Sequence, residues 1–311
     1  MMRSGPICES VRQLQEETLV PALKFGWLSP VIGPPESDHV PLVIYQEEHI
    51  LPMALPHFDS VWVCDHFYGF DRKTDPFLEG WTTLVWLAAR FPNVMVGHHV
   101  LGLGYRHPAL TAKMAATLQT LSGGRVILGI GAGWREDEYR RYGYEFPKAS
   151  VRIAQLDEAV QLIRKMWTEE AATFTGKHFQ ITEAYAPPAP DPVPPILIGG
   201  SGEQLMLPLV GRQADMWNTN GNKGLELFNH KKEIVFRNAE AAGRDPSKIV
   251  LTITLETPLP KTSEDSSRWL NTLRSFNKAG VGHVLCDFGH VTSTEQVQRF
   301  VDEVIKPIRA G

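Results

Sequence analysis

The sequence of 311 residues has few cysteines and no long apolar run. Its three cysteines, Cys8, Cys64 and Cys286, lie far apart and form no C-x-x-C pair, which argues against a disulfide framework and a zinc knuckle. No apolar stretch reaches the roughly 18 residues of a membrane-spanning helix, and the N-terminal residues mix charges where a signal peptide would have an apolar segment. We therefore expect a cytoplasmic protein without a membrane partner.

The chain also carries little net charge. Its 31 Lys and Arg against 35 Asp and Glu give a net charge of -4 at pH 7, and no basic stripe interrupts the balance. A nucleic-acid partner is therefore not expected. Hydrophobic residues make up 43% and charged residues 21%, which is typical of a globular chain with a large core. The length fits either two average domains or one α/β barrel.

Short β-branched runs alternate along the chain with longer stretches of helical period, which is typical of βα units and a parallel sheet. The eight strand candidates are residues 23–28, 60–63, 94–100, 126–130, 196–198, 215–217, 249–255 and 283–286. Eight such units close most naturally into a (β/α)8 TIM barrel, whose reactive groups lie at the carboxyl ends of the strands. An open doubly wound sheet is the alternative, but no G-x-G-x-x-G motif follows the first strand.

Apolar spacing predicts the helices between these strands. One predicted helix starts near Pro108, ends before Gly123-Gly124, and has an apolar face made of Leu110, Met114, Leu118 and Leu121. A second has a face made of Ile153, Leu156, Val160, Ile163 and Trp167. The last helix has a face made of Val297, Phe300, Val301, Val304 and Ile305, and we expect it to stop at Pro307.

The predicted domain organisation is an N-terminal extension over residues 1–22 and a single barrel domain over 23–311. An insertion, about residues 169–195, interrupts the barrel before its fifth strand. Its proline-rich part, residues 187–195, should be an extended tether outside the sheet, because repeated prolines lock φ and remove backbone donors. A linker between two domains is the competing interpretation, although βα units of the same character continue on both sides.

One histidine-containing pair follows a predicted strand, and a second lies at the end of one. In Asp65-His66 the carboxylate can hold the imidazole tautomer while the imidazole moves a proton, but a pair that merely caps the next loop fits equally well. In His98-His99, adjacent strand residues point to opposite faces, so at most one of them faces the barrel axis. They cannot bind a metal together, and no metal is expected. For His99 the alternative is a core histidine bonded to a backbone carbonyl.

Two glycine-rich turns also follow predicted strands. Gly131-Ala132-Gly133-Trp134 precedes an acidic run, residues 136–138, that we expect to cap the next helix. These glycines allow close approach of either a flat ring or another part of the backbone. The second turn, Gly199-Gly200-Ser201-Gly202, predicts a cradle of N–H groups for the phosphate of a bound cofactor, because the Walker pattern is absent. A tight turn without a ligand is the alternative.

Five blocks, taken in order, resemble the bacterial luciferase-like superfamily of flavin and deazaflavin oxidoreductases. They are FDSVWVCDHF (58–67), EGWTTL (79–84), YRHPALTAKMAATLQTLSGGR (105–125), LGIGAGWREDEY (128–139) and PPILIGGSGE (194–203). The branch that depends on the deazaflavin coenzyme F420 is the most similar. The resemblance implies a barrel with the redox ring at the carboxyl ends of the strands and its phosphate on the 199–202 turn. It also implies a non-proline cis peptide at His99-Val100.

The resemblance also implies roles for individual residues. His66 would be the proton carrier and Asp65 would orient it, both facing the ring. The ring would further contact His99, Val100, Gly102, Ala132, Gly133 and Trp134. The sugar-phosphate dehydrogenase branch has a glutamate acid where this chain has Trp134, which counts against that substrate and that proton donor. An apolar substrate pocket would instead include Trp134, Trp27, Tyr68 and Phe70. Arg106 and His107 also match one of the family blocks. Alternatively, these two residues serve only to start the next helix.

The function implied is hydride transfer between F420 and a small organic substrate. An FMN-dependent monooxygenase, supplied with reduced flavin by a flavin reductase partner, is the first alternative. A flavin-binding protein without turnover is the second, although the presence of both Asp65-His66 and the glycine-rich turns weighs against it. Members of the superfamily are often dimers, so a homodimer is expected.

Overall fold

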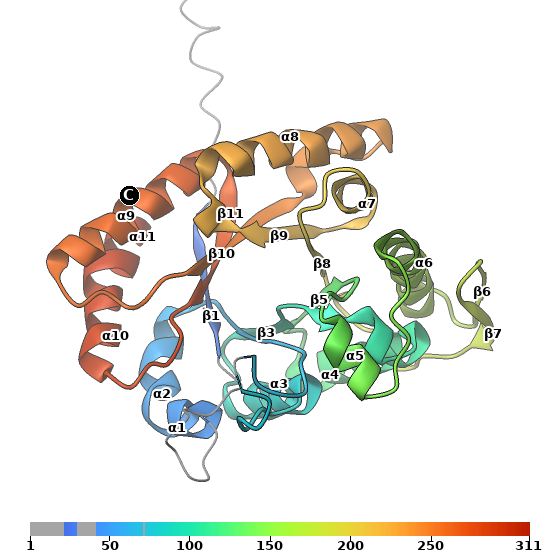
Figure 1. Ribbon diagram of the computed structural model, residues 1–311, viewed down its shortest axis with the longest axis horizontal. Helices are drawn as coiled ribbons and strands as arrows, with labels where there is room; N and C mark the ends of the chain where they lie inside the picture. Colours follow the sequence, from blue (N-terminus) through green and yellow to red (C-terminus); the bar gives the residue numbers. More distant parts are fainter. Residues whose placement is uncertain (1–21, 30–41, 71) are drawn as a thin grey trace, which may run out of the picture.

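The computed structural model describes residues 22–29, 42–70 and 72–311. The predicted N-terminal extension, residues 1–22, therefore lies outside the described residues except for its last one. The main sheet has the strand order β3-β2-β1-β11-β10-β9-β8-β5-β4, and a further pairing of β3 with β5 closes it. Its paired strands are parallel. The predicted (β/α)8 barrel is confirmed (Figure 1).

Each of the eight predicted strands matches a strand of the barrel within a few residues. The strands are β1 (Lys24–Leu28), β2 (Ser60–Val63), β3 (Met95–His98), β4 (Leu101–Gly102), β5 (Val126–Gly131), β8 (Ile196–Gly199), β9 (Met216–Asn220), β10 (Val250–Glu256) and β11 (Val281–Asp287). The short strand β4 was not predicted; it follows β3 across the peptide bond His99-Val100, which is cis as the resemblance implied.

Helices surround the barrel (Figure 1). They are α1 (Leu42–His49), α2 (Leu51–Ala54), α3 (Gly80–Arg90), α4 (Pro108–Ser122), α5 (Glu136–Arg141), α6 (Ala149–Thr168), α7 (Met206–Gln213), α8 (Leu225–Ala241), α9 (Ser263–Lys278), α10 (Thr294–Phe300) and α11 (Lys306–Arg309). Short 3-10 turns lie at η1 (Leu55–His57), η2 (Leu103–Tyr105), η3 (Gly221–Lys223) and η4 (Pro246–Lys248), and a π turn at η5 (Val301–Ile305). No helix in the described ranges is long and apolar enough to cross a membrane.

The bounds of α4 are confirmed, but its predicted apolar face is only half right: Leu118 is buried and Met114 packs against the core. Pro108 stands in the first turn, and Gly123 ends the helix in the left-handed conformation with φ of 69°. Leu110 and Leu121, however, are exposed. The face that is buried carries small side chains, including Ala112, Ala115 and Ala116. Alanines have no long side chain, so they let α4 approach its neighbours closely, and the leucine spacing misled the prediction.

The predicted apolar faces of α6 and of the last helical segment are buried, with only Ile153 partly exposed. The predicted stop at Pro307 is wrong, because α11 continues to Arg309. Pro307 lies in the first turn of α11, where its missing N–H group leaves no helical bond unmade.

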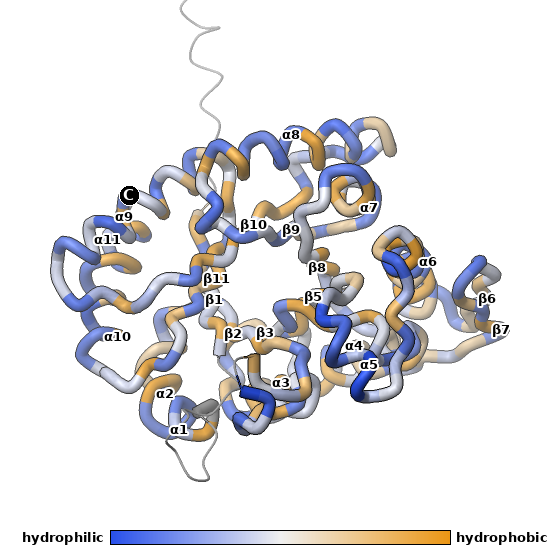
Figure 2. Tube along the Cα trace, in the orientation of Figure 1, coloured by the Kyte–Doolittle hydropathy of each residue, from blue (hydrophilic) through white to orange (hydrophobic). Residues whose placement is uncertain are grey.

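The barrel has an inner and an outer core. The inner core is a buried cluster of one residue from each of six strands: Leu28, Trp62, Ile127, Leu197, Met216 and Leu285. A larger cluster packs the outer face of the strands against the helices. Figure 2 shows hydrophobic residues along the central strands, with more hydrophilic residues on the outer sides of the helices. Filling both cores leaves the carboxyl ends of the strands as the place where a ligand can enter.

The predicted insertion lies outside the barrel sheet. It forms a separate antiparallel hairpin of β6 (Ala172–Thr175) and β7 (Gln180–Ala184), which the sequence did not predict. The proline-rich segment then returns to the barrel as an extended tether. Buried Gln119 on α4 donates from Nε2 to the carbonyl of Pro192 at 2.6 Å and accepts from the N–H of Val126 at 2.8 Å. The assignment of residues 23–311 to one domain stays a prediction.

Two histidines are buried in the barrel wall. The ring of His98 stacks on Trp81 of α3, with centroids 5.0 Å apart. Nε2 of His283 lies 2.8 Å from Oγ of Ser60. Burial lowers the pKa of each imidazole to about 4. Both side chains are therefore neutral in the folded protein near pH 7.

We predict that the free energy of unfolding falls as the pH drops from about 6.5 to about 4. In this window the unfolded imidazoles bind protons and the buried ones do not, which costs roughly 3 kcal/mol for each histidine by pH 4. His98→Phe keeps a ring on Trp81 and removes one titrating group. In urea unfolding at several pH values, its stability should depend on pH less steeply, by about 1.4 kcal/mol per pH unit. Equal slopes for the two proteins would contradict this.

Candidate active site

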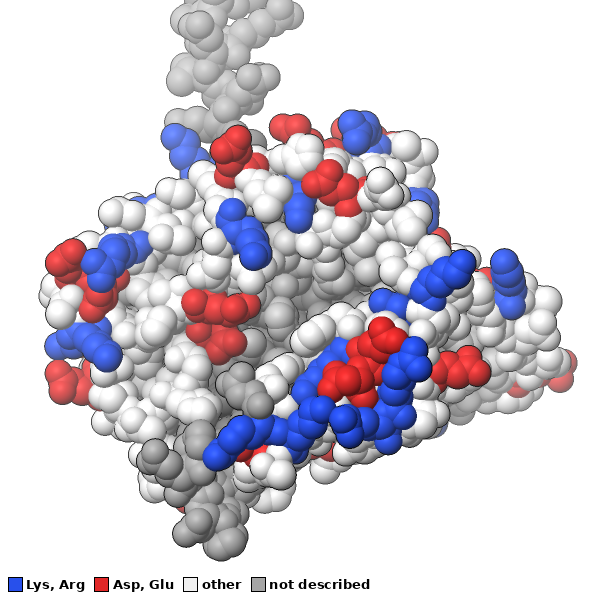
Figure 3. All heavy atoms as spheres, viewed as in Figure 1, with Lys and Arg blue, Asp and Glu red and all other residues white. Residues whose placement is uncertain are grey.

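A cavity of about 380 Å³ opens at the carboxyl ends of the strands, a size in the range of small-molecule sites. Figure 3 shows a hollow in this face with mainly uncharged walls and a mixed group of charged side chains on one rim. The cavity brings together these predicted residues: Asp65, His66, His99, Val100, Gly102, Ala132, Gly133, Trp134, Gly199, Gly200 and Ser201. It also contains residues that the sequence did not single out, namely Leu101, Tyr105, Met206, Asn218, Thr219 and Asn220.

His66 is oriented by Glu138, not by Asp65 as predicted. Nδ1 of His66 lies 2.7 Å from Oε2 of Glu138. The hydroxyl of Tyr105 donates to the same oxygen at 2.5 Å, and the N–H of Phe67 donates to the other at 2.7 Å. The side chain of Glu138 has no exposed surface. The bond to Nδ1 directs the second nitrogen of His66, Nε2, away from Glu138.

The prediction that the acidic run 136–138 caps a helix is wrong for Glu138. Burial alone would raise the pKa of its carboxyl, but the hydrogen bonds from His66, Tyr105 and Phe67 hold the pKa below its usual range. Burial and the bond to Glu138 raise the pKa of Tyr105, which keeps this phenol protonated. The buried network thus presents a fixed negative charge to His66.

The carboxylate of Asp65 is committed to other partners. Arg106 binds it through both guanidinium ends, at 2.8 and 3.1 Å, and the N–H of Gly102 donates to Oδ2 at 3.0 Å. Arg106 also contacts Glu79, the N-cap of α3. Asp65 therefore fixes the strand-end backbone at Gly102. His107, in contrast, serves the start of α4, where Nδ1 accepts the N–H of Ala109.

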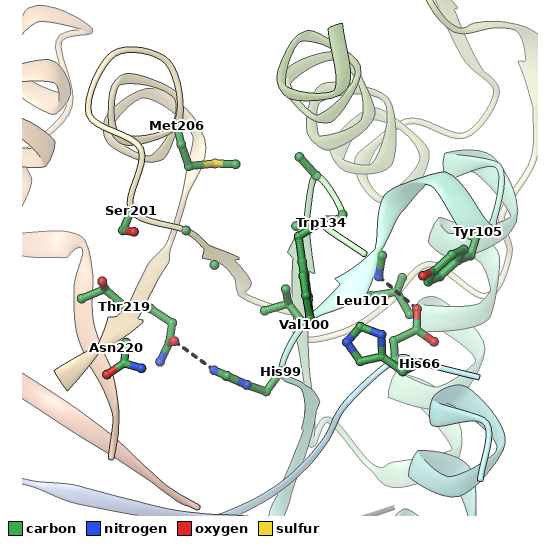
Figure 4. A pocket seen from close by; sticks show the side chains of 18 residues that line it. His66, His99, Val100, Leu101, Tyr105, Trp134, Ser201, Met206, Thr219 and Asn220 are labelled. Carbon is green, nitrogen blue, oxygen red and sulfur yellow. Dashed lines mark hydrogen bonds between the residues drawn. The ribbon is translucent and has the colours of Figure 1, made fainter. Parts of the chain in front are cut away.

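Of the two adjacent histidines, only His99 lines the cavity. Nε2 of His99 lies 3.0 Å from Oδ1 of Asn218 (Figure 4). It also lies 2.8 Å from Oγ1 of Thr254, and both partners stand on strands across the barrel mouth. Burial lowers the pKa of His99, so the ring stays neutral. His99 is therefore held by side-chain partners as well as by its own backbone, and it places a polar ring edge at the cavity.

Aromatic rings surround His66 at the mouth of the cavity. Its ring centroid lies 5.6 Å from that of Trp134 and 5.1 Å from that of Phe70. Phe70 lies at this rim although it does not line the cavity itself. Tyr68 is turned away: its ring covers the guanidinium of Arg135 at 4.2 Å, and its hydroxyl donates to Asp137. Tyr68 therefore does not line the predicted substrate pocket.

The placement of Trp27 in the substrate pocket is wrong. Trp27 is fully buried, and its ring packs against Phe58 and Phe288, with centroids 5.3 and 4.9 Å apart. Its neighbour on β1, Leu28, belongs to the inner cluster. Because side chains alternate along a strand, Trp27 points outward into the helical layer.

The glycines after β5 serve packing. A Cβ on Gly131 would approach a methyl group of Val100 to 2.8 Å, and one on Gly133 would approach the hydroxyl of Tyr139 to 2.2 Å. Gly133 also has φ of 78°, which favours glycine. These glycines let Val100 and Tyr139 take their places beside the cavity, so the packing alternative accounts for them.

The turn after β8 lines the cavity through Gly200 and Ser201 and has backbone donors without a protein partner. Gly200 donates its N–H to the carbonyl of Asn218, but within the described part of the chain the N–H groups of Ser201 and Gly202 and the hydroxyl of Ser201 bond to no protein acceptor. Gly202 itself does not line the cavity; its carbonyl accepts from Met206 and Leu207 at the start of α7. Uncommitted N–H groups of this kind suit a phosphate.

The comparisons with known proteins agree with this architecture. The family model described as luciferase-like monooxygenase matches residues 57–299. The chain belongs to the luciferase-like monooxygenase family. Its relatives include F420-dependent glucose-6-phosphate dehydrogenases. That of Amycolatopsis mediterranei (strain U-32) is 31% identical over 251 residues, which are 79% of this chain and 73% of that protein. The enzyme of Nakamurella multipartita (strain ATCC 700099) is 32% identical over 300 residues, which cover 91% of this chain and 80% of that protein.

Among solved structures, an F420-dependent secondary alcohol dehydrogenase in complex with an F420-acetone adduct aligns with a TM-score of 0.72 at 20% identity. The alignment covers 92% of this chain and 98% of that one. The resemblance predicted from the sequence blocks is therefore confirmed, and so is the luciferase-like barrel fold.

In this luciferase-like barrel we expect Arg106→Ala to lower the free energy of unfolding by about 3–5 kcal/mol. The substitution leaves the carboxylate of Asp65, which is fully buried, without its cation. Arg268→Ala is the matched control, because Arg268 pairs with Glu264 at the surface and should cost less than about 1 kcal/mol. Urea denaturation of both variants measures the difference. Similar losses for the two variants would show that the buried pair is not special.

Proposed function

We propose that this protein is an F420-dependent oxidoreductase that transfers a hydride to or from a small organic substrate. The observation that carries the proposal is a single cavity in which His66, held by the buried carboxylate of Glu138, lies opposite an uncommitted donor turn at Ser201. The F420-dependent dehydrogenases among the relatives support the choice of coenzyme. A small-molecule substrate fits the size of the cavity.

The residues of the cavity fit a flat ring with a phosphate tail. Val100, Leu101 and Ala132 give an apolar surface for the ring, and His99 gives a polar edge. The N–H groups around Ser201 lie on the far side of the cavity from His66, where a phosphate would be held without any cation (Figure 4). When bound, the deazaflavin supplies the hydride acceptor or donor.

The protein's own part of the chemistry is proton transfer and positioning. With Nδ1 bonded to Glu138, Nε2 of His66 is the nitrogen left to exchange a proton with substrate oxygen. The carboxylate of Glu138 stabilises the imidazolium that forms when Nε2 takes a proton. Asp65 has the supporting role of fixing the backbone at Gly102 through its bond to that N–H group. The intact His66–Glu138 pair favours an enzyme over a flavin-binding protein without turnover.

A cytoplasmic location and a homodimeric assembly are part of the proposal. The location rests on the composition, and the assembly rests on the frequent dimers of the family. A flavin reductase partner belongs only to the FMN-dependent alternative. Sedimentation equilibrium of the purified protein would test the assembly directly.

Titration of the apo-protein distinguishes the cofactors. F420 should quench the protein fluorescence at lower concentration than FMN does, whereas a clear preference for FMN would favour the monooxygenase alternative. Ser201→Ala should weaken F420 binding by about tenfold, the effect of one lost hydrogen bond to a charged group. The same variant should bind the phosphate-free deazaflavin as the wild type does. An equal effect on both ligands would place the phosphate elsewhere.

Substitutions of His66 and Glu138 test the proton transfer. His66→Ala should lower kcat by roughly 10²–10⁴-fold while F420 affinity stays within about threefold of the wild type. Glu138→Gln should lower kcat by about tenfold or more, because the neutral amide stabilises the imidazolium less. Glu136→Gln on the same helix is the control, since Glu136 is exposed and pairs with Arg140. Turnover that persists in His66→Ala would remove His66 as the proton carrier.

A further inference from the structure

The mouth of the cavity has an exposed aromatic wall that the proton transfer does not use. The side chains of Trp134 and Phe70 are 67% and 45% exposed. Their rings are parallel within 11°, with centroids 6.3 Å apart. The ring of His66 is nearly perpendicular to both, at 75° and 73°. Phe77 closes the group, 6.1 Å from Phe70. Exposed apolar surface next to a reactive imidazole is suited to hold a ligand.

In the part of the chain that the structure describes, the wall of the cavity carries no basic side chain that could pair with a charged substrate. Neither Lys nor Arg is among the residues that line it. The two arginines beside it are already bound: Arg106 pairs with Asp65 and Glu79. Arg135, with its side chain 6% exposed, donates to the carbonyls of Tyr68 and Gly69. A substrate phosphate next to His66 would thus lose its hydration without gaining an opposite charge.

Acidic side chains on the other rim add to this effect. Glu256 and Asp287 stand side by side at the carboxyl ends of β10 and β11. Asn220, which lines the cavity, donates to Glu256 at 3.0 Å. Both carboxylates lie close enough to His99 to oppose the lowering of its pKa by burial. A substrate anion beside Asn220 would therefore be repelled by these two carboxylates.

We propose that the substrate is an uncharged alcohol with an apolar, ring-sized substituent, or the matching carbonyl compound in the reverse direction, and not a sugar phosphate. The proposal rests on the proposed function. The substituent packs against Trp134 and Phe70, which brings the hydroxyl to Nε2 of His66. The carbinol carbon then gives its hydride to the oxidised deazaflavin, and the hydroxyl gives its proton to Nε2. The carbon–oxygen double bond forms, so electrons and protons balance.

An activity assay with the F420-loaded protein tests this proposal. Under anaerobic conditions, the loss of deazaflavin absorbance measures the oxidation of three probe substrates. We expect kcat/KM for 1-phenylethanol to exceed that for glucose 6-phosphate by at least about 100-fold, with 2-propanol between them because it lacks a ring. Preference for glucose 6-phosphate, or no turnover of either alcohol, would overturn the substrate class while F420 binding still stood. Failure to bind F420 would instead overturn the proposed function, and this inference with it.

Variants of the aromatic wall separate a binding role from a structural one. Trp134→Ala and Phe70→Ala should each raise KM for 1-phenylethanol about tenfold, with kcat within about threefold, and F420 affinity should be unchanged in Phe70→Ala. Trp134→Phe should restore KM to within about threefold of the wild type. Tyr185→Ala is the matched control, because Tyr185 is 62% exposed on the insertion and does not line the cavity. An unchanged KM in both alanine variants would show that the wall does not contact substrate.

Discussion

One buried carboxylate connects the loops on which the catalytic side of the cavity is built. Glu138 on α5 accepts hydrogen bonds from His66 and Phe67 after β2 and from Tyr105 in η2. A buried charge is tolerated only when its hydrogen bonds are complete, so these three segments cannot separate without a large cost. The orientation of His66 is thus a property of the fold and not of its own loop alone.

The other charges of the site follow the same logic. Asp65 and Arg106 neutralise each other at the wall of the cavity, and Arg135 is covered by the rings of Tyr68 and Phe70. Every ion pair near His66 therefore belongs to the scaffold. What remains open to a ligand is apolar surface, the imidazoles of His66 and His99, uncharged polar side chains and backbone N–H groups. Selectivity in such a site comes from shape and hydration more than from charge.

The sequence predicted the barrel because the signals for it are local. Each strand is a short β-branched run, and the Gly123 cap and the proline tether act within a few residues. The pairing of side chains across the barrel is not local. Glu138 looked like a helix cap because its partners lie 33 to 72 residues away. Likewise, alternation along β1 separates Trp27 from Leu28, but the sequence does not say which of them faces inward.

Gln119 affects how the barrel responds to changes in the length of the β6–β7 hairpin. One side-chain amide ties the returning end of the hairpin segment to α4 and also supports the first residue of β5. Chain length gained or lost between β6 and β7 is taken up before this point and is not passed on to the strands. A change in the hairpin can therefore leave β5 in place, provided that Gln119 and the segment it binds are kept, together with the bonds to Glu158 and the packing of Phe174, Phe179 and Ile181.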